Sequence, residues 1–180
     1  MVLVYTIGHS TRTIEELLGL LRENDVQTVV DVRRFPGSRR HPQFGKDQLP
    51  AWLATAGIAY VHADALGGRR VPREDSPNDG WRNAQFRGYA DYMDTDEFRA
   101  ALHDLIERAS KQRVAIMCAE AVPWRCHRQL IADALLANGV QVRHILQPGR
   151  TSEHELNPSA RVLAGGRVVY PGTGTQMDLL

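Results

Sequence analysis

The chain contains little cysteine, almost no net charge and no long hydrophobic run. Only two of its 180 residues are cysteine, which is too few for a disulfide framework. The formal net charge of +1 at pH 7 argues against a protein that is basic over its whole surface. No apolar stretch approaches membrane-spanning length, and the first residues lack the charged segment of a signal peptide. We therefore expect a cytoplasmic protein with reduced thiols and no contact with a membrane.

The length of the chain suits a single domain with its own hydrophobic core. Apolar runs alternate with segments of helical periodicity, which predicts an α/β fold with a mostly parallel five-stranded sheet and helices on both faces. The expected strands are residues 2–7, 27–33, 58–62, 114–118 and 140–145, and the expected helices are residues 13–21, 47–57, 86–93, 94–106 and 129–138. We assign residues 1–148 to this α/β domain. Residues 149–180 form a C-terminal extension, in which residues 161–170 predict a small β-hairpin with a Gly-Gly turn.

Polar side chains stand at or just after the end of each predicted strand. Because the carboxyl ends of parallel strands meet at one edge of a sheet, and α/β proteins bind ligands there, we expect a single crevice at this edge. It should contain His9 and Ser10 from the first strand, Asp31 and Arg33 from the second, His62 from the third, Cys118 and Glu120 from the fourth, and His144 from the fifth.

Two loops are expected to cover this crevice. Residues 33–46 contain Arg39, Arg40 and the aromatic residues Phe35 and Phe44 but no acidic residue. Arginines interleaved with aromatic rings suit phosphates and bases, although a solvated loop whose charges pair with acids elsewhere is the alternative. The long loop of residues 63–84, which carries Arg69, is typical of a lid or a binding loop. Since the whole chain is not basic, a local phosphate pocket is favoured over extended duplex binding.

The segment of residues 114–128 concentrates the most chemistry, since it holds both cysteines at a strand-to-helix turn. Cys118 is either a small apolar residue at the end of a buried strand or a nucleophile whose thiol pKa is lowered by the helix N-terminus and arginines. Glu120 is either an ion-pair anchor or a general acid/base. Cys126, His127 and Arg128 at the helix start would contact the substrate, though Cys126 and His127 also suit structural roles there. A permanent disulfide between the cysteines is not expected in a reducing cytoplasm.

Two alternative chemistries could use this segment. Zinc ligands usually occur in pairs two to four residues apart, whereas Cys118 and Cys126 are separated by seven residues. We therefore expect no metal ion and no other cofactor. Rhodanese-like or phosphatase-like chemistry uses an anion-cradling loop with a Cys-x5-Arg spacing, but six residues separate Cys118 from Arg125, so it remains a minor alternative.

Several separated motifs together resemble a known family. They are Tyr5 to Ser10, Asp31-Val-Arg33 with Pro36 and Ser38-Arg39, Leu66-Gly-Gly68, Tyr89-Ala with Tyr92-Met93, Cys118-Ala-Glu120 and Cys126-His-Arg128. In this order they resemble the domain-of-unknown-function family 488 over residues 5–145. The resemblance implies an α/β domain with Cys-x-Glu and Cys-His-Arg motifs and leaves the reaction open.

The leading hypothesis is an enzyme, a hydrolase or transferase, that acts on a phosphate-bearing nucleotide or nucleic-acid substrate. Glu120 would be the general acid/base, Cys118 the nucleophile or a polar wall, and His9 or Asp31 would assist. The rival hypothesis is a binding module without catalysis, whose groove reads a nucleotide or a nucleic-acid end. The anion would be held by Arg33, Arg39, Arg40, Arg69 and Arg128, and further substrate contacts would come from Ser10, His62, Cys126 and His127.

Overall fold

A six-stranded sheet forms the centre of the protein, whose structure is a computed structural model describing residues 1–172. Residues 173–180, the end of the predicted extension, lie outside this description. The strand order is β3-β2-β4-β1-β5-β6. The strands are β1 Leu3–Gly8, β2 Thr28–Asp31, β3 Ala59–His62, β4 Val114–Cys118, β5 Gln141–Gln147 and β6 Arg150–Glu153. The helices are α1 Ile14–Glu23, α2 Leu49–Thr55, α3 Ala84–Tyr92, α4 Asp96–Lys111 and α5 Arg128–Ala137.

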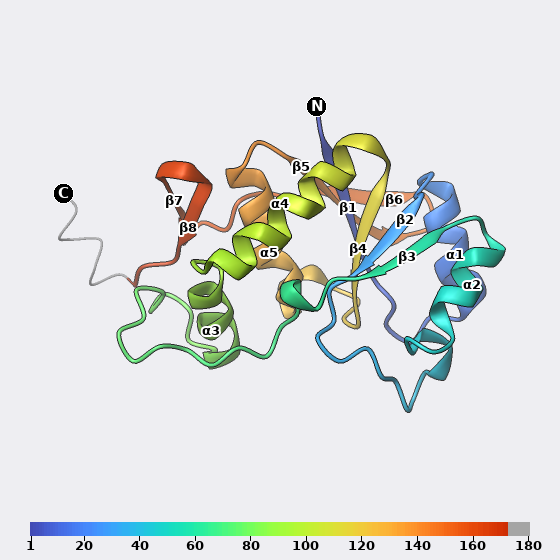
Figure 1. Cartoon of the computed structure of the whole chain (residues 1–180), viewed down its shortest axis with the longest axis horizontal. Coiled ribbons are helices and arrows are strands. Elements are labelled where there is room, and N and C mark those ends of the chain that lie inside the picture. Colours follow the sequence, from blue (N-terminus) through green and yellow to red (C-terminus); the bar gives the residue numbers. More distant parts are fainter. Residues whose placement is uncertain (173–180) are drawn as a thin grey trace.

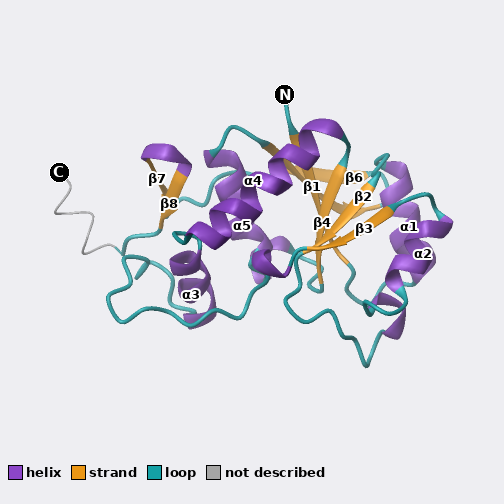
Figure 2. Ribbon diagram, viewed as in Figure 1, coloured by secondary structure: helices purple, strands orange, loops and turns teal. Residues whose placement is uncertain are grey.

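The sheet carries a hydrophobic core on each face, so the fold has three layers (Figures 1 and 2). Alternate residues of a strand point to opposite faces. In β4, Ile116 and Cys118 accordingly pack with α4 and α5, whereas Ala115 and Met117 pack with α1 and α2. Because both faces are covered, all of β2 and β4 is buried, as expected for central parallel strands. The predicted α/β class is confirmed.

The five predicted strands are mutually parallel, and their register fixes the edge at which the site lies. Gly8 at the end of β1 is level with Cys118 at the end of β4, and Asp31 at the end of β2 is level with His62 at the end of β3. The loops that follow β2 and β3 run along this carboxyl edge, below the sheet in Figure 1. The ends of four strands therefore face the same two loops.

Helix starts are set locally by side-chain caps. Thr13 and Glu16 form a capping box at the start of α1, in which each side chain accepts a hydrogen bond from the other residue's backbone N–H. The side chains of Asn83 and Thr95 cap α3 and α4 by accepting hydrogen bonds from backbone N–H groups of the first helical turn. These caps satisfy backbone donors that a helix leaves free, and they fix where each helix leaves the loops around the site.

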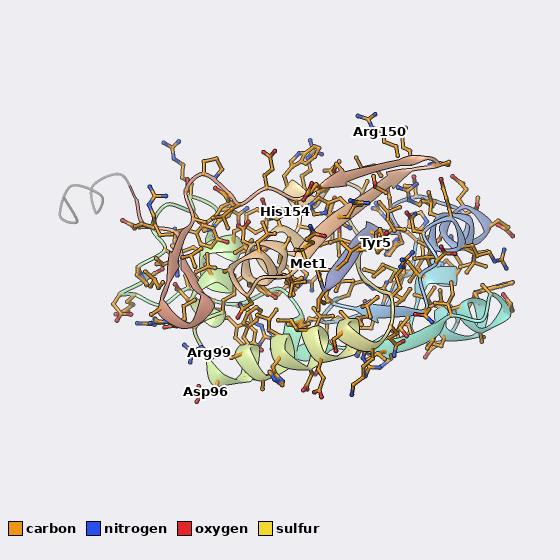
Figure 3. All side chains as sticks on the ribbon, turned by 90° about the horizontal axis from the view of Figure 1, so that it is seen from above. Met1, Tyr5, Asp96, Arg99, Arg150 and His154 are labelled. Carbon is orange, nitrogen blue, oxygen red and sulfur yellow. The ribbon has the colours of Figure 1, made fainter. Side chains whose placement is uncertain are left out.

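The C-terminal part adds one strand that the sequence did not predict. Strand β6 pairs antiparallel with β5, so the sheet has six strands. The predicted hairpin is present as β7 Arg161–Leu163 and β8 Arg167–Val169, which form a separate two-stranded sheet. Viewed from above, Arg150 and His154 lie on the opposite side of the molecule from Asp96 and Arg99, with Tyr5 between them (Figure 3). In residues 1–172, no helix combines the length and the hydropathy needed to cross a bilayer.

Candidate functional site

A cavity of about 510 Å³ opens at the carboxyl edge of the sheet, between the loops that follow β1, β2, β3 and β4. This volume lies in the range of ordinary small-molecule sites. Strand β4 and the turn into α5 supply one side, and α3 supplies Phe86 and Tyr89. Nine of the predicted site residues line it: His9, Arg33, Arg39, Arg40, Arg69, Cys118, Glu120, Cys126 and His127.

The two cysteines form a buried thiol pair in this cavity. Both are free, with exposed fractions of 2% for Cys118 and 7% for Cys126. Burial opposes ionisation of Cys118, but a hydrogen bond from the Cys126 thiol and the nearby charge of Arg128 outweigh it, so the pKa of Cys118 is lowered. Donation of that hydrogen bond, together with burial, raises the pKa of Cys126 well above its usual range. Cys118 is therefore the thiol that ionises first.

The start of helix α5 contacts the second thiol. Cys126 comes two residues before the helix, and its Sγ accepts a hydrogen bond from the backbone N–H of Arg128 at 3.4 Å. On its other side, Sγ lies 3.5 Å from Nδ1 of His127. The His127 ring donates Nε2–H to the carbonyl of Val32 at 2.9 Å, which leaves Nδ1 free to accept a proton.

Two imidazoles in the cavity are held in the neutral form. Burial is the main reason that the pKa of His9 is lowered to about 4, and the same holds for His127. The His9 ring stacks on Phe44, with 4.4 Å between ring centroids, and its Nδ1–H donates to the carbonyl of Ser10 at 3.0 Å. At neutral pH both rings are therefore uncharged and add no positive charge to the cavity.

Asp31 and His62 support the site from behind and do not line the cavity. The Asp31 carboxylate is fully buried and accepts hydrogen bonds from Nε and Nη2 of Arg33 at 2.9 and 2.7 Å. It also accepts one from the Tyr60 hydroxyl at 2.6 Å. His62 donates Nε2–H to the carbonyl of Arg33 at 2.8 Å. Asp31 therefore positions Arg33. The sequence predicted that Asp31 assists catalysis, but its carboxylate oxygens are already occupied by these hydrogen bonds.

Arg128 also lies behind the cavity wall. Its side chain is 0% exposed, and Nη2 donates to the carbonyl of Ala121 at 3.3 Å. Among residues 1–172, its Nε and Nη1 have no hydrogen-bond partner. Arg128 does not line the cavity, so the predicted contact between its guanidinium and a bound anion is not supported. Its positive charge instead helps to lower the pKa of Cys118.

The mouth of the cavity is lined by arginines from both loops. Arg39, Arg40 and Arg69 are exposed there, and Arg34 donates Nη1–H to the carbonyl of Arg69 at 2.9 Å, which ties the two loops together. Phe35 is 64% exposed, with the guanidiniums of Arg34 and Arg69 at 5.5 and 5.7 Å from its ring centroid. Phe35 is therefore an exposed ring close to two cations at the cavity mouth, and it is available for stacking.

Three expectations about the crevice are corrected. His144 is level with Thr6, inside the sheet, and hydrogen-bonds to Thr6 and His154 at 2.6 and 2.9 Å, away from the cavity. Phe44 is fully buried under His9 and is not a free aromatic surface. Ser10, with φ of 48°, lines a separate small hollow that also contains Glu120. His144 was misplaced because β5 continues to Gln147, and the sequence does not show how the loop residues Phe44 and Ser10 pack.

Several lining residues were not predicted from the sequence as contacts. Phe86 and Tyr89 come from α3, and the Tyr89 ring packs on His127 with 4.9 Å between centroids. Tyr89 belongs to a motif of the family resemblance, which is the one feature that could have identified it. Arg125 also lines the cavity. Arg125 is the last residue of a short 3₁₀ helix, Pro123–Arg125, and no distinctive sequence pattern marks it as a cavity residue.

The cavity residues do not converge as a set of metal ligands. Within residues 1–172, the group of His, Cys, Asp or Glu side chains close enough to share an ion is His103, Asp104 and Glu107, on the exposed face of α4. The thiols and imidazoles of the cavity instead hydrogen-bond to one another and to backbone carbonyls. Thiols and imidazoles are groups that can act as nucleophiles and in proton transfer.

The fold and the cavity define an α/β protein with a thiol- and arginine-lined ligand site at the carboxyl edge of a parallel sheet. Residues 13–135 match the model of the family described as "Domain of unknown function DUF488". Since the match spans more than half of the chain, the protein belongs to this family, as the motifs predicted. No curated protein and no solved structure gives a significant match to the chain.

Proposed function

We propose that the protein is a cytoplasmic enzyme that acts on a phosphate-bearing substrate, a nucleotide or nucleic acid, in the cavity at the carboxyl edge. The observation that carries the proposal is the meeting of arginines from two loops with a polarised thiol pair in one cavity. The arginines hold phosphate oxygens, to which their planar fork is suited. The aromatic walls, Phe86 and Tyr89, accommodate the apolar part of the substrate.

In the proposed chemistry, Cys118 is the nucleophile. The Cys126 thiol and the Arg128 charge stabilise its thiolate. Glu120, which is exposed at the cavity mouth, is the general acid/base for the leaving group or the incoming water. The neutral ring of His127, 3.5 Å from Cys126, helps to position that thiol.

This chemistry differs from that of a phosphatase-like anion loop. The backbone N–H groups of Arg125 and Cys126 donate to the carbonyls of Val122 and Pro123 within the loop itself. These two donors are occupied, which disfavours the rhodanese-like or phosphatase-like chemistry that is the minor alternative. Arginine side chains then take the role that backbone donors have in such loops.

A second candidate function is a binding module without catalysis. The exposed ring of Phe35 between two arginines favours it, because a stacking platform binds nucleotides whether or not a reaction follows. The two functions differ in whether Glu120 and Cys118 are needed for turnover or only for stability.

The test begins with ligand identification. Small molecules and oligonucleotides that co-purify with the protein are identified by mass spectrometry, and turnover of the phosphate-bearing ones is measured. The Glu120→Gln variant removes the charge and keeps the size, so turnover should fall by about 10²–10⁴-fold while binding and melting temperature are retained. The matched control is Glu15→Gln, an exposed carboxylate of α1 outside the cavity, which should leave turnover unchanged.

Cys118→Ser should reduce turnover comparably if its thiolate attacks the substrate. Burying the hydroxyl without a partner costs about 1–3 kcal/mol, so melting is measured in parallel. If both variants bind and turn over normally but melt earlier, the motif is a structural anchor and the binding module is the correct function.

A further inference from the structure

We propose that the substrate is a nucleotide within a single strand of nucleic acid, so that flanking phosphates and bases lie along the cavity mouth. This inference rests on the proposed function and specifies its substrate class. On this proposal, a free mononucleotide would contact only part of the surface formed by the cavity and its mouth. Three observations carry the inference: the number of arginines at the cavity mouth, the positions of two exposed aromatic rings, and the volume of the cavity.

The cavity mouth has more arginine side chains without a salt bridge than are needed to bind one phosphate group. In residues 1–172, none of the arginines 34, 39, 40, 69 and 125 forms a salt bridge, and all of them line the cavity. Glu120 is the acidic residue in the same lining. One phosphate is satisfied by one or two guanidiniums. In a chain with a net charge of +1, this concentration indicates a ligand with several phosphates.

Exposed aromatic rings occur both at the cavity mouth and next to it. Phe35 is 64% exposed on the loop after β2 and lines the cavity. Trp124 is 63% exposed and lines a neighbouring hollow together with Glu120 and Arg125, which also line the cavity. The cavity and this hollow therefore adjoin. With one base held in the cavity, Phe35 is available for stacking at its mouth and Trp124 is available to a neighbouring base of the strand.

The cavity itself has room for one nucleotide unit. Its volume of about 510 Å³ suits a single base with its sugar, and its inner wall contains the thiols and Tyr89. A base reaches this wall only when it is unpaired, and stacking on Phe35 also needs an open base face. The site therefore fits a single strand in preference to a duplex.

The experiment compares fluorescence anisotropy of labelled single-stranded 12-mers, of DNA and of RNA, with competition by AMP, ATP and the matching duplex. At least one of the two single strands should bind at least about 10-fold more tightly than the duplex and the mononucleotides. The slope of log K against log salt should be about −0.7 for each phosphate contacted, and therefore about −2 or steeper for three contacts.

Variants locate the surface. Phe35→Ala should weaken strand binding by about 5- to 150-fold, the loss expected for one stacked base. Arg39→Ala combined with Arg40→Ala should reduce the salt slope by about 1.4. The matched control is Arg22→Ala with Arg150→Ala, two exposed arginines of α1 and β6 outside the cavity, which should leave the slope unchanged. Melting temperatures confirm that each variant is folded.

Three results would overturn the inference. Mononucleotides that bind as tightly as the strands, with equal loss in the double arginine variant, would leave the proposed function standing with a smaller substrate. Duplex that binds more tightly than both single strands would point to backbone recognition alone. If neither strands nor nucleotides bind, the proposed function fails as well.

Discussion

Arg128 shows how one buried residue can change the chemistry of another. Its guanidinium is fully buried, and two of its nitrogens have no partner within residues 1–172. Removing a cation from water is costly unless an anion offsets the cost. The acidic groups on which Arg128 acts are the two thiols, and it lowers the pKa of Cys118. The energetic cost of burying the arginine and the reactivity of the cysteine are therefore linked.

This linkage predicts how alkylation of Cys118 depends on pH. In Arg128→Gln, the rate of modification by iodoacetamide should reach its half-maximum at higher pH than in the unmodified protein, because the thiolate loses a nearby positive charge. Arg128→Lys keeps the charge and should show a smaller shift. Rates are followed by mass spectrometry of the peptide containing Cys118. An unchanged profile in Arg128→Gln would mean that the Cys126 hydrogen bond alone sets the pKa.

At the level of single residues, the sequence predicted which side chains gather at the carboxyl edge better than it predicted their roles. Cys118 and Glu120 follow a buried apolar run, and topology was enough to place them. The roles of Asp31 and Arg128 depend on which partners satisfy them. Those partners, Tyr60 and Ala121, are brought in by tertiary folding, and no pattern in the sequence identifies them.

Gly8 is the point at which strand β1 meets the loop after β4. A Cβ atom at this position would overlap the carbonyl group of Glu120 and lie 3.0 Å from Nη1 of Arg128. The absence of a side chain lets the loop cross directly over the strand end. The position of Glu120 in the cavity therefore depends on a glycine in another element.

Gly8→Ala is accordingly expected to be strongly destabilising, by more than about 2 kcal/mol, because backbone atoms must move to admit the methyl group. Gly19→Ala is the matched control. Gly19 lies in α1, is exposed, and a Cβ there meets no atom of residues 1–172 within 4 Å. Alanine should stabilise that helix by about 1 kcal/mol. Urea unfolding of both variants measures the difference, and a neutral Gly8→Ala would show that the loop can move freely.

Elements with a strong apolar pattern, a helix cap or a turn signal were predicted well, whereas strand β6, which has none of these, was not. The buried run of β4 and the capping box of α1 identify those elements. Strand β6 reads Arg-Thr-Ser-Glu and is exposed along its whole length. It forms because the edge of β5 offers free backbone groups, and that cause is tertiary. A polar edge strand leaves no apolar pattern in the sequence.

Three buried histidines affect the stability of the whole molecule. Burial is the main cause that lowers the pKa of His9 and His127 to about 4 and that of His144 to about 3. In the unfolded chain, each has its usual pKa near 6.5. Between about pH 6.5 and 4, the unfolded state therefore binds more protons than the folded state, and the free energy of unfolding falls as the pH falls.

We expect the urea midpoint to decrease steadily from pH 6.5 towards pH 4.5, before most carboxylates titrate. Each histidine contributes a slope of up to about 1.4 kcal/mol per pH unit. His127→Gln should flatten this dependence. His103→Gln, an exposed residue of α4, should leave it unchanged. A midpoint that stays constant over this range would contradict the neutral state of the buried rings.

The central position of β1 has a consequence for synthesis of the chain. This apolar strand pairs with β4 and β5, so Val4 meets Val114 and Val142, which are translated more than a hundred residues later. At about 5–20 residues per second, both edges of β1 wait for roughly 6–22 s before the first partner emerges from the ribosome. During that interval the apolar strand has neither of its two partners in the sheet. The cavity cannot assemble until the residues up to His127 have been made, because they line it.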